Sequence, residues 1–340
     1  MEDGQLNCLV TGSTGYVGGR LVPRLLAAGH RVRAMARNRA QVNKMPWADD
    51  AEVVEADLTD PDSLATAFAG IDVVYYLVHS MGSSPNFSSA ESESATHTVA
   101  AAREAGVSRL VYLGGLHPRT GELSPHLQSR TAVGETLLSS GITTVVLQAG
   151  VIIGAGSASY EMIRLLTTAL PVLPVPTWTR HLIQPIAIDD ALYYLVAAAN
   201  AEVPVSRCWD IGGPNVLRYK DMLRDFAEEA GLPRRRLITL PLISPALSTW
   251  GIAFLTPMSA DLVRPLVESL RHDAVMKDRD IDTVIAPPPG ALRTYRNSIQ
   301  QALRPPVTTY DLHNPPSAAV PLDTDPDWSH HGRQTRSATT

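Results

Sequence analysis

Three glycines, at positions 12, 15 and 18, are the residues of this sequence whose spacing most directly predicts chemistry. Gly12 allows a tight turn, Gly15 lets the backbone approach a phosphate without a Cβ in the way, and Gly18 lets a helix and a strand pack closely. The start of the following helix offers free N–H groups and a partial positive charge to an anion. The loop from Leu9 to Gly19 therefore predicts a binding site for the pyrophosphate of a dinucleotide.

The end of the second predicted strand indicates which dinucleotide is bound. The sequence there is Ala36-Arg37-Asn38-Arg39. Sites for NAD place an acidic residue at this point for the ribose 2′-hydroxyl, whereas a cation pairs with the 2′-phosphate of NADP. Arg37 and Arg39 therefore favour NADPH, with NADH as the less favoured cofactor. The alternative is that both arginines are solvated charges at the start of a helix.

Strands and helices alternate between residues 6 and 148, and this alternation positions the glycine loop. Gly29 and Gly106 stand where the C-terminal glycine of a helix belongs. The expected strands are 6–11, 31–36, 52–56, 73–78, 109–113 and 143–148, and the expected helices are 16–28, 38–45, 61–69, 87–105 and 126–140. The pattern predicts an α/β fold of the Rossmann type, a doubly wound parallel sheet that binds ligands at its carboxyl edge.

The regular alternation of strands and helices ends after residue 150, and the expected organisation of the chain has three parts. Residues 1–150 form the NAD(P)-binding core, and residues 151–303 form a smaller substrate-side lobe interleaved with it. This lobe contains expected helices near 157–169, 190–200, 219–230 and 246–272, the last interrupted by prolines, and short strands near 183–188 and 207–211. Residues 304–340 are rich in Pro, Ser, Thr and Asp, so we expect a disordered tail.

Composition excludes some partners and compartments. The formal net charge of −5 offers no basic surface for nucleic acid. The two cysteines, Cys8 and Cys208, have no metal-ligand spacing, and the start of the sequence has no secretory signal, so a reducing cytoplasm is expected. Prolines interrupt the apolar segment 240–258, which predicts a buried or lid helix pair and no transmembrane segment. A helix lying on a membrane surface is the alternative.

Further motifs make the sequence similar to the short-chain dehydrogenase/reductase superfamily, in its extended or atypical branch. These are Gly-x-x-Gly-x-x-Gly at 12–18, Asp57-Leu58 after the third strand, Ile186–Asp190 and Trp209–Pro214. Tyr75–Gly82 and Ala149–Ser159 resemble more closely a bacterial group of NmrA-like, NAD(P)H-binding proteins. The resemblance implies that the pyrophosphate is lined by Ser13, Thr14, Tyr16 and Val17, the adenine by Asp57 and Leu58, and the ribose region by Leu77, Val78 and His79.

The catalytic residues of that superfamily are replaced in this sequence. Its reductases carry a Tyr-x-x-x-Lys pair on the helix after the fifth strand, in which the tyrosine passes a proton to the substrate and the lysine holds the ribose. The corresponding helix here carries His126 and Arg130, four residues apart on one face, and Leu113-Gly114-Gly115 replaces the usual serine.

Three residues are therefore the candidates for catalysis. An unperturbed imidazole titrates at about pH 6.5, so His126 could donate a proton, and Arg130 could hold the ribose. His79, after the fourth strand, is a further candidate for proton transfer. The alternative is that the three are ordinary surface or hydrogen-bonded residues.

Two functions remain open from the sequence. The first is an NADPH-dependent oxidoreductase acting on an apolar carbonyl or enone, with a proton from His126 or bound water and a substrate wall formed by Ile238–Leu270. The second is an NADPH sensor, regulator or assembly factor that resembles NmrA-like proteins and binds a protein partner without turnover. No metal site is expected, since His330-His331 has no partner at metal-ligand spacing.

Overall fold

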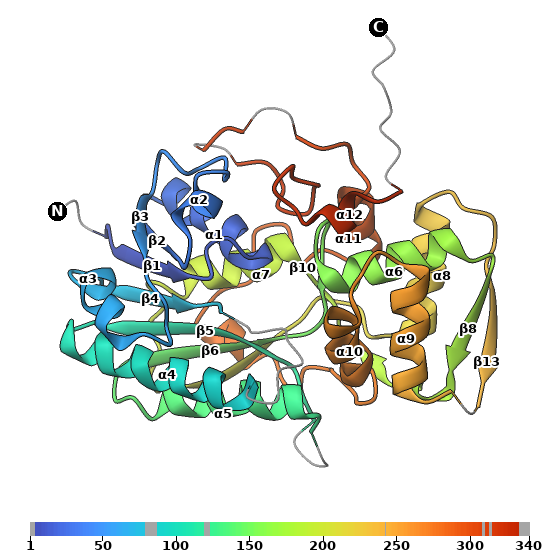
Figure 1. The fold of residues 1–340 in the computed structure, drawn as a ribbon, viewed down its shortest axis with the longest axis horizontal. Helices are drawn as coiled ribbons and strands as arrows, with labels where there is room; N and C mark the ends of the chain where they lie inside the picture. The colour runs from blue at the N-terminus through green and yellow to red at the C-terminus, as the bar shows by residue number, and fades with distance from the viewer. Residues whose placement is uncertain are drawn as a thin grey trace, which may run out of the picture.

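A seven-stranded sheet organises the protein (Figure 1). The computed structural model describes residues 4–78, 87–118, 123–241, 243–307, 310–312 and 315–332. All strand pairs of the sheet are parallel. In spatial order the strands are β11 (Arg207–Ile211), β6 (Thr143–Ala149), β5 (Arg109–Gly115), β4 (Val73–Tyr76), β1 (Asn7–Thr11), β2 (Arg31–Ala36) and β3 (Glu52–Glu55). The predicted doubly wound Rossmann fold is confirmed.

Helices cover both faces of this sheet, and its central strands β4 and β5 are accordingly almost wholly buried. One face packs against α1 (Tyr16–Ala27) and α7 (Ile188–Ala197) in one hydrophobic cluster. The other packs against α3 (Leu64–Phe68), α4 (Phe87–Glu104) and α5 (Pro125–Leu138) in a second cluster. Short helices, α2 (Arg39–Val42) and the 3-10 turn Pro61–Ser63, complete this half.

The strand order reverses beside β1, whose neighbours are β2 on one side and β4 on the other. Connections leave this point in opposite directions, so a crevice opens outside the carboxyl ends of the two strands. The glycine loop follows β1 directly and therefore lies at the crevice.

A second lobe packs around its own hydrophobic cluster. It is built from α6 (Ala158–Ala169), α8 (Tyr219–Glu229), α9 (Pro245–Leu255), α10 (Ala260–Ser269) and α11 (Tyr295–Ala302), with the parallel pair β8 (Val172–Pro176) and β13 (Arg236–Leu240) at one end (Figure 1). Smaller elements are β7 (Ile152–Ile153), β9 (Leu182–Ile183), β10 (Ile186–Ala187), β12 (Leu217–Arg218) and the 3-10 turns Thr177–Arg180 and Asp280–Thr283. The expected helical stretch 246–272 is two helices, α9 and α10, packed against each other.

The helix α9 is apolar on its outer face as well as its inner one. Leu247, Trp250 and Phe254 follow each other at helical spacing, and the exposed fractions of Trp250 and Phe254 are 71% and 89%. In the described part of the chain, no helix combines the length and apolarity needed to cross a membrane.

The expectation of a disordered tail is wrong for residues 315–332. Ala318, Ala319 and Val320 are buried, and the short helix α12 spans Asp327–His330. Arg20 of α1 is buried and ion-paired with Asp325 at 2.8 Å, and it also donates to the carbonyl oxygen of Ala318. The composition argument counts only apolar area, whereas this segment also supplies acceptors to the buried guanidinium of Arg20.

Candidate active site

The glycine loop has a shape that side chains at two of its positions would prevent. Gly12 has a φ of +67°, and a Cβ there would lie 3.0 Å from the carbonyl oxygen of Leu77. A Cβ on Gly18 would lie 2.2 Å from the carbonyl oxygen of Gly12. A Cβ on Gly15 would come within 4 Å only of that same oxygen, at 3.2 Å. Turn and helix packing thus require Gly12 and Gly18, and Gly15 leaves the backbone accessible from the crevice.

A cavity of about 780 Å³ extends from this loop along the carboxyl edge of the sheet to α10. That volume lies within the usual range of cofactor and ligand sites. The structure brings together on its lining most of the predicted cofactor residues, namely Gly12, Thr14, Gly15, Tyr16, Val17, Gly18, Arg37, Asp57, Leu58, Leu77 and Val78. The bare loop, its helix N-terminus and this elongated cavity fit a dinucleotide.

One predicted cofactor residue of the described part of the chain does not line this cavity. The side chain of Ser13 is buried, and its hydroxyl donates to the carbonyl oxygen of Met35, which ties the loop to β2. His79 lies outside the described residues.

The two arginines after β2 have different surroundings. Arg37 is exposed and lines the cavity. The guanidinium of Arg39 instead donates to the carbonyl oxygen of Val53, and its backbone N–H donates to the Glu55 carboxylate. Arg37 is therefore the better placed of the two to meet a 2′-phosphate.

Asp57 forms a turn on the lining of the same cavity, after β3. Its carboxylate accepts from both the backbone N–H and the hydroxyl of Thr59, each at 2.9 Å. This turn holds Leu58 and Thr59 against the cavity. The structure gives Asp57 this turn-forming role beside its place on the lining.

His126 stands in the first turn of α5, and its environment changes its acid–base behaviour. Ser124 caps the helix by accepting from the N–H of Leu127, and Pro125 occupies the first position. Burial, and then the positive charge of Arg130, lower the pKa of His126 to about 4. The ring is therefore neutral at pH 7, and the expectation of titration near pH 6.5 does not hold for it.

Arg130 lies one turn further along α5, where the cavity meets the end of β5. Its Nη2 donates to the carbonyl oxygen of Leu113 at 3.4 Å, and its own carbonyl oxygen accepts from the Tyr112 hydroxyl at 3.2 Å. A Cβ on Gly115 would lie 3.9 Å from Nη1. The guanidinium therefore lies close to the backbone at the end of β5.

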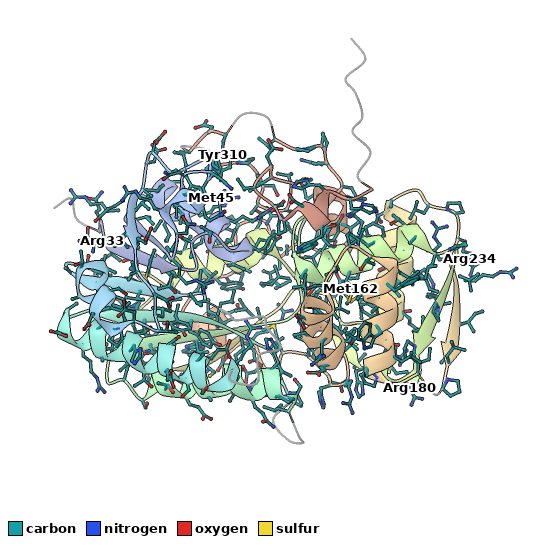
Figure 2. All side chains as sticks on the ribbon, in the orientation of Figure 1. Arg33, Met45, Met162, Arg180, Arg234 and Tyr310 are labelled. Carbon is teal, nitrogen blue, oxygen red and sulfur yellow. The ribbon has the colours of Figure 1, made fainter. Side chains whose placement is uncertain are left out.

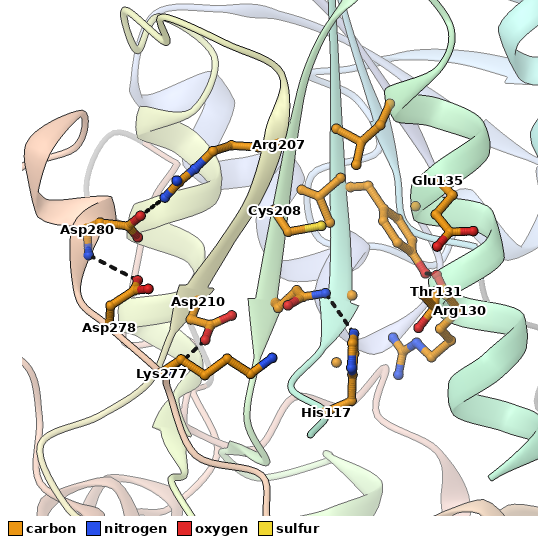
Figure 3. Close-up of a pocket in the computed structure, with 17 residues that line it drawn as sticks. His117, Arg130, Thr131, Glu135, Arg207, Cys208, Asp210, Lys277, Asp278 and Asp280 are labelled. Atoms are coloured by element: carbon orange, nitrogen blue, oxygen red, sulfur yellow. Dashed lines mark hydrogen bonds and ion pairs between the residues drawn. The ribbon is translucent and has the colours of Figure 1, made fainter. Parts of the chain in front are cut away.

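Sequence reasoning missed a second, polar cavity of about 390 Å³ on the other side of this strand end. Figure 3 shows Arg130 of α5 on one side of it and Asp210 of β11 on the other, with His117 between them. A ring nitrogen of His117 contacts the Gln148 amide at 3.1 Å, and the Asp210 carboxylate accepts from the N–H of Lys277. His117 follows β5 by two residues, so its place at the sheet edge was the signal available in the sequence.

A buried polar contact supports α5 from behind. The hydroxyl of Ser129 donates to the carboxylate of Glu91 on α4, and both side chains are buried. Burial raises the pKa of Tyr76 and of Tyr112, and the neighbouring carboxyl group of Glu91 makes a smaller contribution in the same direction. This contact fixes the helix turn that carries His126 and Arg130.

Comparisons with known proteins agree with this geometry. Residues 12–161 match a family described as NAD(P)H-binding. Uncharacterized proteins of Mycobacterium tuberculosis and Mycobacterium bovis are 28% identical over 239 residues, covering 70% of this chain and 24% of theirs. The chain thus spans about a quarter of the length of these relatives.

A ceramide reductase of Caulobacter vibrioides is 28% identical over 197 residues, which cover 57% of this chain and 61% of that enzyme. Among solved structures, the NADPH-dependent quinone oxidoreductase of Escherichia coli, complexed with NADPH, superposes with a TM-score of 0.68 at 18% identity, over 87% of this chain and 100% of that one. The fold is therefore that of NAD(P)H-binding oxidoreductases.

Proposed function

We propose that this protein is an NADPH-dependent oxidoreductase acting on an apolar carbonyl or enone, since residues 12–161 match an NAD(P)H-binding family and the fold is that of NAD(P)H-binding oxidoreductases. One observation carries the proposal. A single cavity joins the glycine loop and Arg37 at one end to His126, Arg130 and an apolar wall at the other.

In this proposal, different residues of the chain bind different parts of the cofactor. The backbone at Gly15 and the start of α1 hold the pyrophosphate, Leu58 contacts the adenine, and Arg37 pairs with the 2′-phosphate, which selects NADPH over NADH. When bound, the dihydronicotinamide supplies a hydride.

His126 and Arg130 polarise the substrate in this proposal. A neutral imidazole can donate its N–H to a carbonyl oxygen and stabilise the charge that develops there, as the neutral histidine of triosephosphate isomerase does. Since the pKa of His126 is lowered to about 4, this hydrogen-bonding role suits it better than loss of a proton from an imidazolium. The proton that completes the reduction then comes from bound water, and Arg130 holds the ribose hydroxyls.

The substrate end of the cavity is mainly apolar. Val151 and Leu116 lie on the sheet side, and Leu266 and Leu270 on the α10 side. Of the expected wall 238–270, this cavity is lined by Pro265, Leu266, Ser269 and Leu270. An apolar substrate is in keeping with the names of two similar proteins, the ceramide reductase and the quinone oxidoreductase.

The test is a titration with NADPH and with NADH, followed by turnover of aldehydes, ketones and quinones in the same samples. We expect tighter binding of NADPH, and turnover that falls in His126→Ala while NADPH binding is retained. Protein that binds NADPH and consumes none of it across the panel contradicts the proposal.

A binding-only function is the second candidate, favoured by the glycines at 114 and 115 and by the loss of the Tyr-x-x-x-Lys pair. In this case NADPH occupancy changes a contact with a protein partner. Steady turnover that depends on His126 excludes it.

A further inference from the structure

A third cavity, of about 260 Å³, lies within the second lobe under α9. Met162, which is buried and marked in Figure 2, stands on its inner wall. The hydroxyls of Thr179 and Ser248 already have acceptors, since each donates to a backbone carbonyl oxygen of its own turn. The rest of the lining is mainly aliphatic, including Leu166, Leu173, Val175, Leu223, Ile252 and Val267.

One helix separates this cavity from the cofactor cavity. On α10, Leu266 lines the cofactor cavity and Val267 lines the apolar one. Leu270, the residue after the last one of α10, lines both. Figure 1 shows α10 between the edge of the large sheet and α9, against which it packs. The two cavities therefore meet at a single leucine side chain.

We propose that the cavity under α9 binds the aliphatic chain of the substrate, while the carbonyl group lies beside His126. The position of the carbonyl rests on the proposed function, and the binding of the chain does not. An apolar cavity of about 150 Å³ is large enough for benzene. By proportion, the cavity under α9 accommodates roughly ten carbons.

The same cavity reaches the protein surface along α9. Leu247 and Leu255 line it, and their exposed fractions are 61% and 42%. An aliphatic chain bound in this cavity can therefore extend as far as the protein surface beside α9. A substrate with a long chain and a reducible head group fits this arrangement, and a short polar substrate leaves the cavity unused.

Gly251 offers a direct test because it lines the cavity and a Cβ on it would meet no atom within 4 Å. Gly251→Phe adds an aromatic ring to the cavity wall without a backbone clash, and Gly251→Ala is the matched control that adds only a methyl group. Decanol and butanol, which cannot be reduced, serve as probes in calorimetric titrations of the full chain. NADPH binding is measured in parallel for each variant.

We expect decanol to bind the wild type and Gly251→Ala well above butanol, because each buried methylene strengthens binding by about fourfold. Decanol binding falls by roughly tenfold or more in Gly251→Phe, while NADPH binding is unchanged. Ser248→Phe, one turn earlier, gives the same loss if Gly251→Phe does not fold. The proposal is overturned if Gly251→Phe and Ser248→Phe both bind decanol as tightly as the wild type does. It is also overturned if the wild type binds decanol no more tightly than butanol. Failure of turnover with intact decanol binding would count against the proposed function alone.

Discussion

The ion pair between Arg20 and Asp325 gives a prediction whose size follows from the structure. The exposed fractions of the two side chains are 5% and 3%, and their charged groups are 2.8 Å apart. Removing one partner of a buried pair costs about 3–5 kcal/mol, because the other charge stays buried. In Asp325→Ala, however, Arg20 keeps the carbonyl oxygens of Ala318 and Ala155 as acceptors, at 2.8 and 3.0 Å.

These acceptors place the loss in the lower part of that range. The N–H of Leu322 also loses its acceptor on Asp325, which adds about 1 kcal/mol. We therefore expect the free energy of unfolding to fall by about 3–4 kcal/mol. At about 2–4 °C per kcal/mol, the melting temperature falls by roughly 10 °C.

Urea unfolding followed by circular dichroism measures this change, with a thermal scan as a second readout. Asp327→Asn is the matched control, since Asp327 lies two residues away and is exposed. Asp325→Asn should have a smaller effect, because it removes the charge and keeps an acceptor oxygen. If Asp325→Ala unfolds within 0.5 kcal/mol of the control, roughly the scatter of neutral surface substitutions, the packing described for residues 315–332 is refuted.

Three further predictions concern the cofactor, the pH dependence and the surface. Arg37→Glu should weaken NADPH binding by about 10–100-fold through loss of a charge-assisted contact, with little effect on NADH binding. Arg39→Glu should change the ratio of NADPH affinity to NADH affinity much less. Calorimetry with both cofactors measures this, and equal effects of the two variants would argue against Arg37 as the selective residue. The folded-state pKa of His126, about 4, lies below its ordinary value of 6.5, so its contribution to stability is present above pH 6.5 and is lost as the pH falls towards 4. His126→Gln should therefore flatten the curve of unfolding free energy between those pH values, and an unchanged slope in urea titrations would show that the ring is not held neutral. If α9 lies on a membrane surface, the fluorescence of Trp250 shifts to the blue when lipid vesicles are added, and Phe254→Ser weakens this shift. An unshifted spectrum at saturating lipid favours the alternative that α9 and α10 form a buried or lid helix pair.

The sequence predicted the elements whose signals are local. The glycine loop is one such case, since the strand, the tight turn and the helix start lie within twenty residues of one another, as the structure has them from Asn7 to Ala27. Arg37 is another, because its position follows from the end of β2 alone. For these residues, spacing along the chain is enough to place them on one edge of the sheet.

Features that depend on distant contacts could not be predicted in this way. Pro174 and Pro176 argue against a strand, yet β8 forms because β13, more than sixty residues later, pairs with it at one end of the second lobe. The cavity under α9 has walls from several separate segments, so no spacing in the sequence indicates it. The neutral state of His126 likewise depends on burial in the assembled fold.

The contact between Arg20 and Asp325 also sets an order of events during synthesis. The sheet has all its strands once Ile211 has been added, but the two partners are 305 residues apart in the sequence. At about 5–20 residues per second, ribosomes need roughly 15–60 seconds to cover that distance. During this interval the first helix carries a charge that its final neighbours do not yet cover. The nascent protein therefore has its glycine loop and its sheet before it can bury Arg20, and the environment of this side chain is completed only after Asp325 has been added.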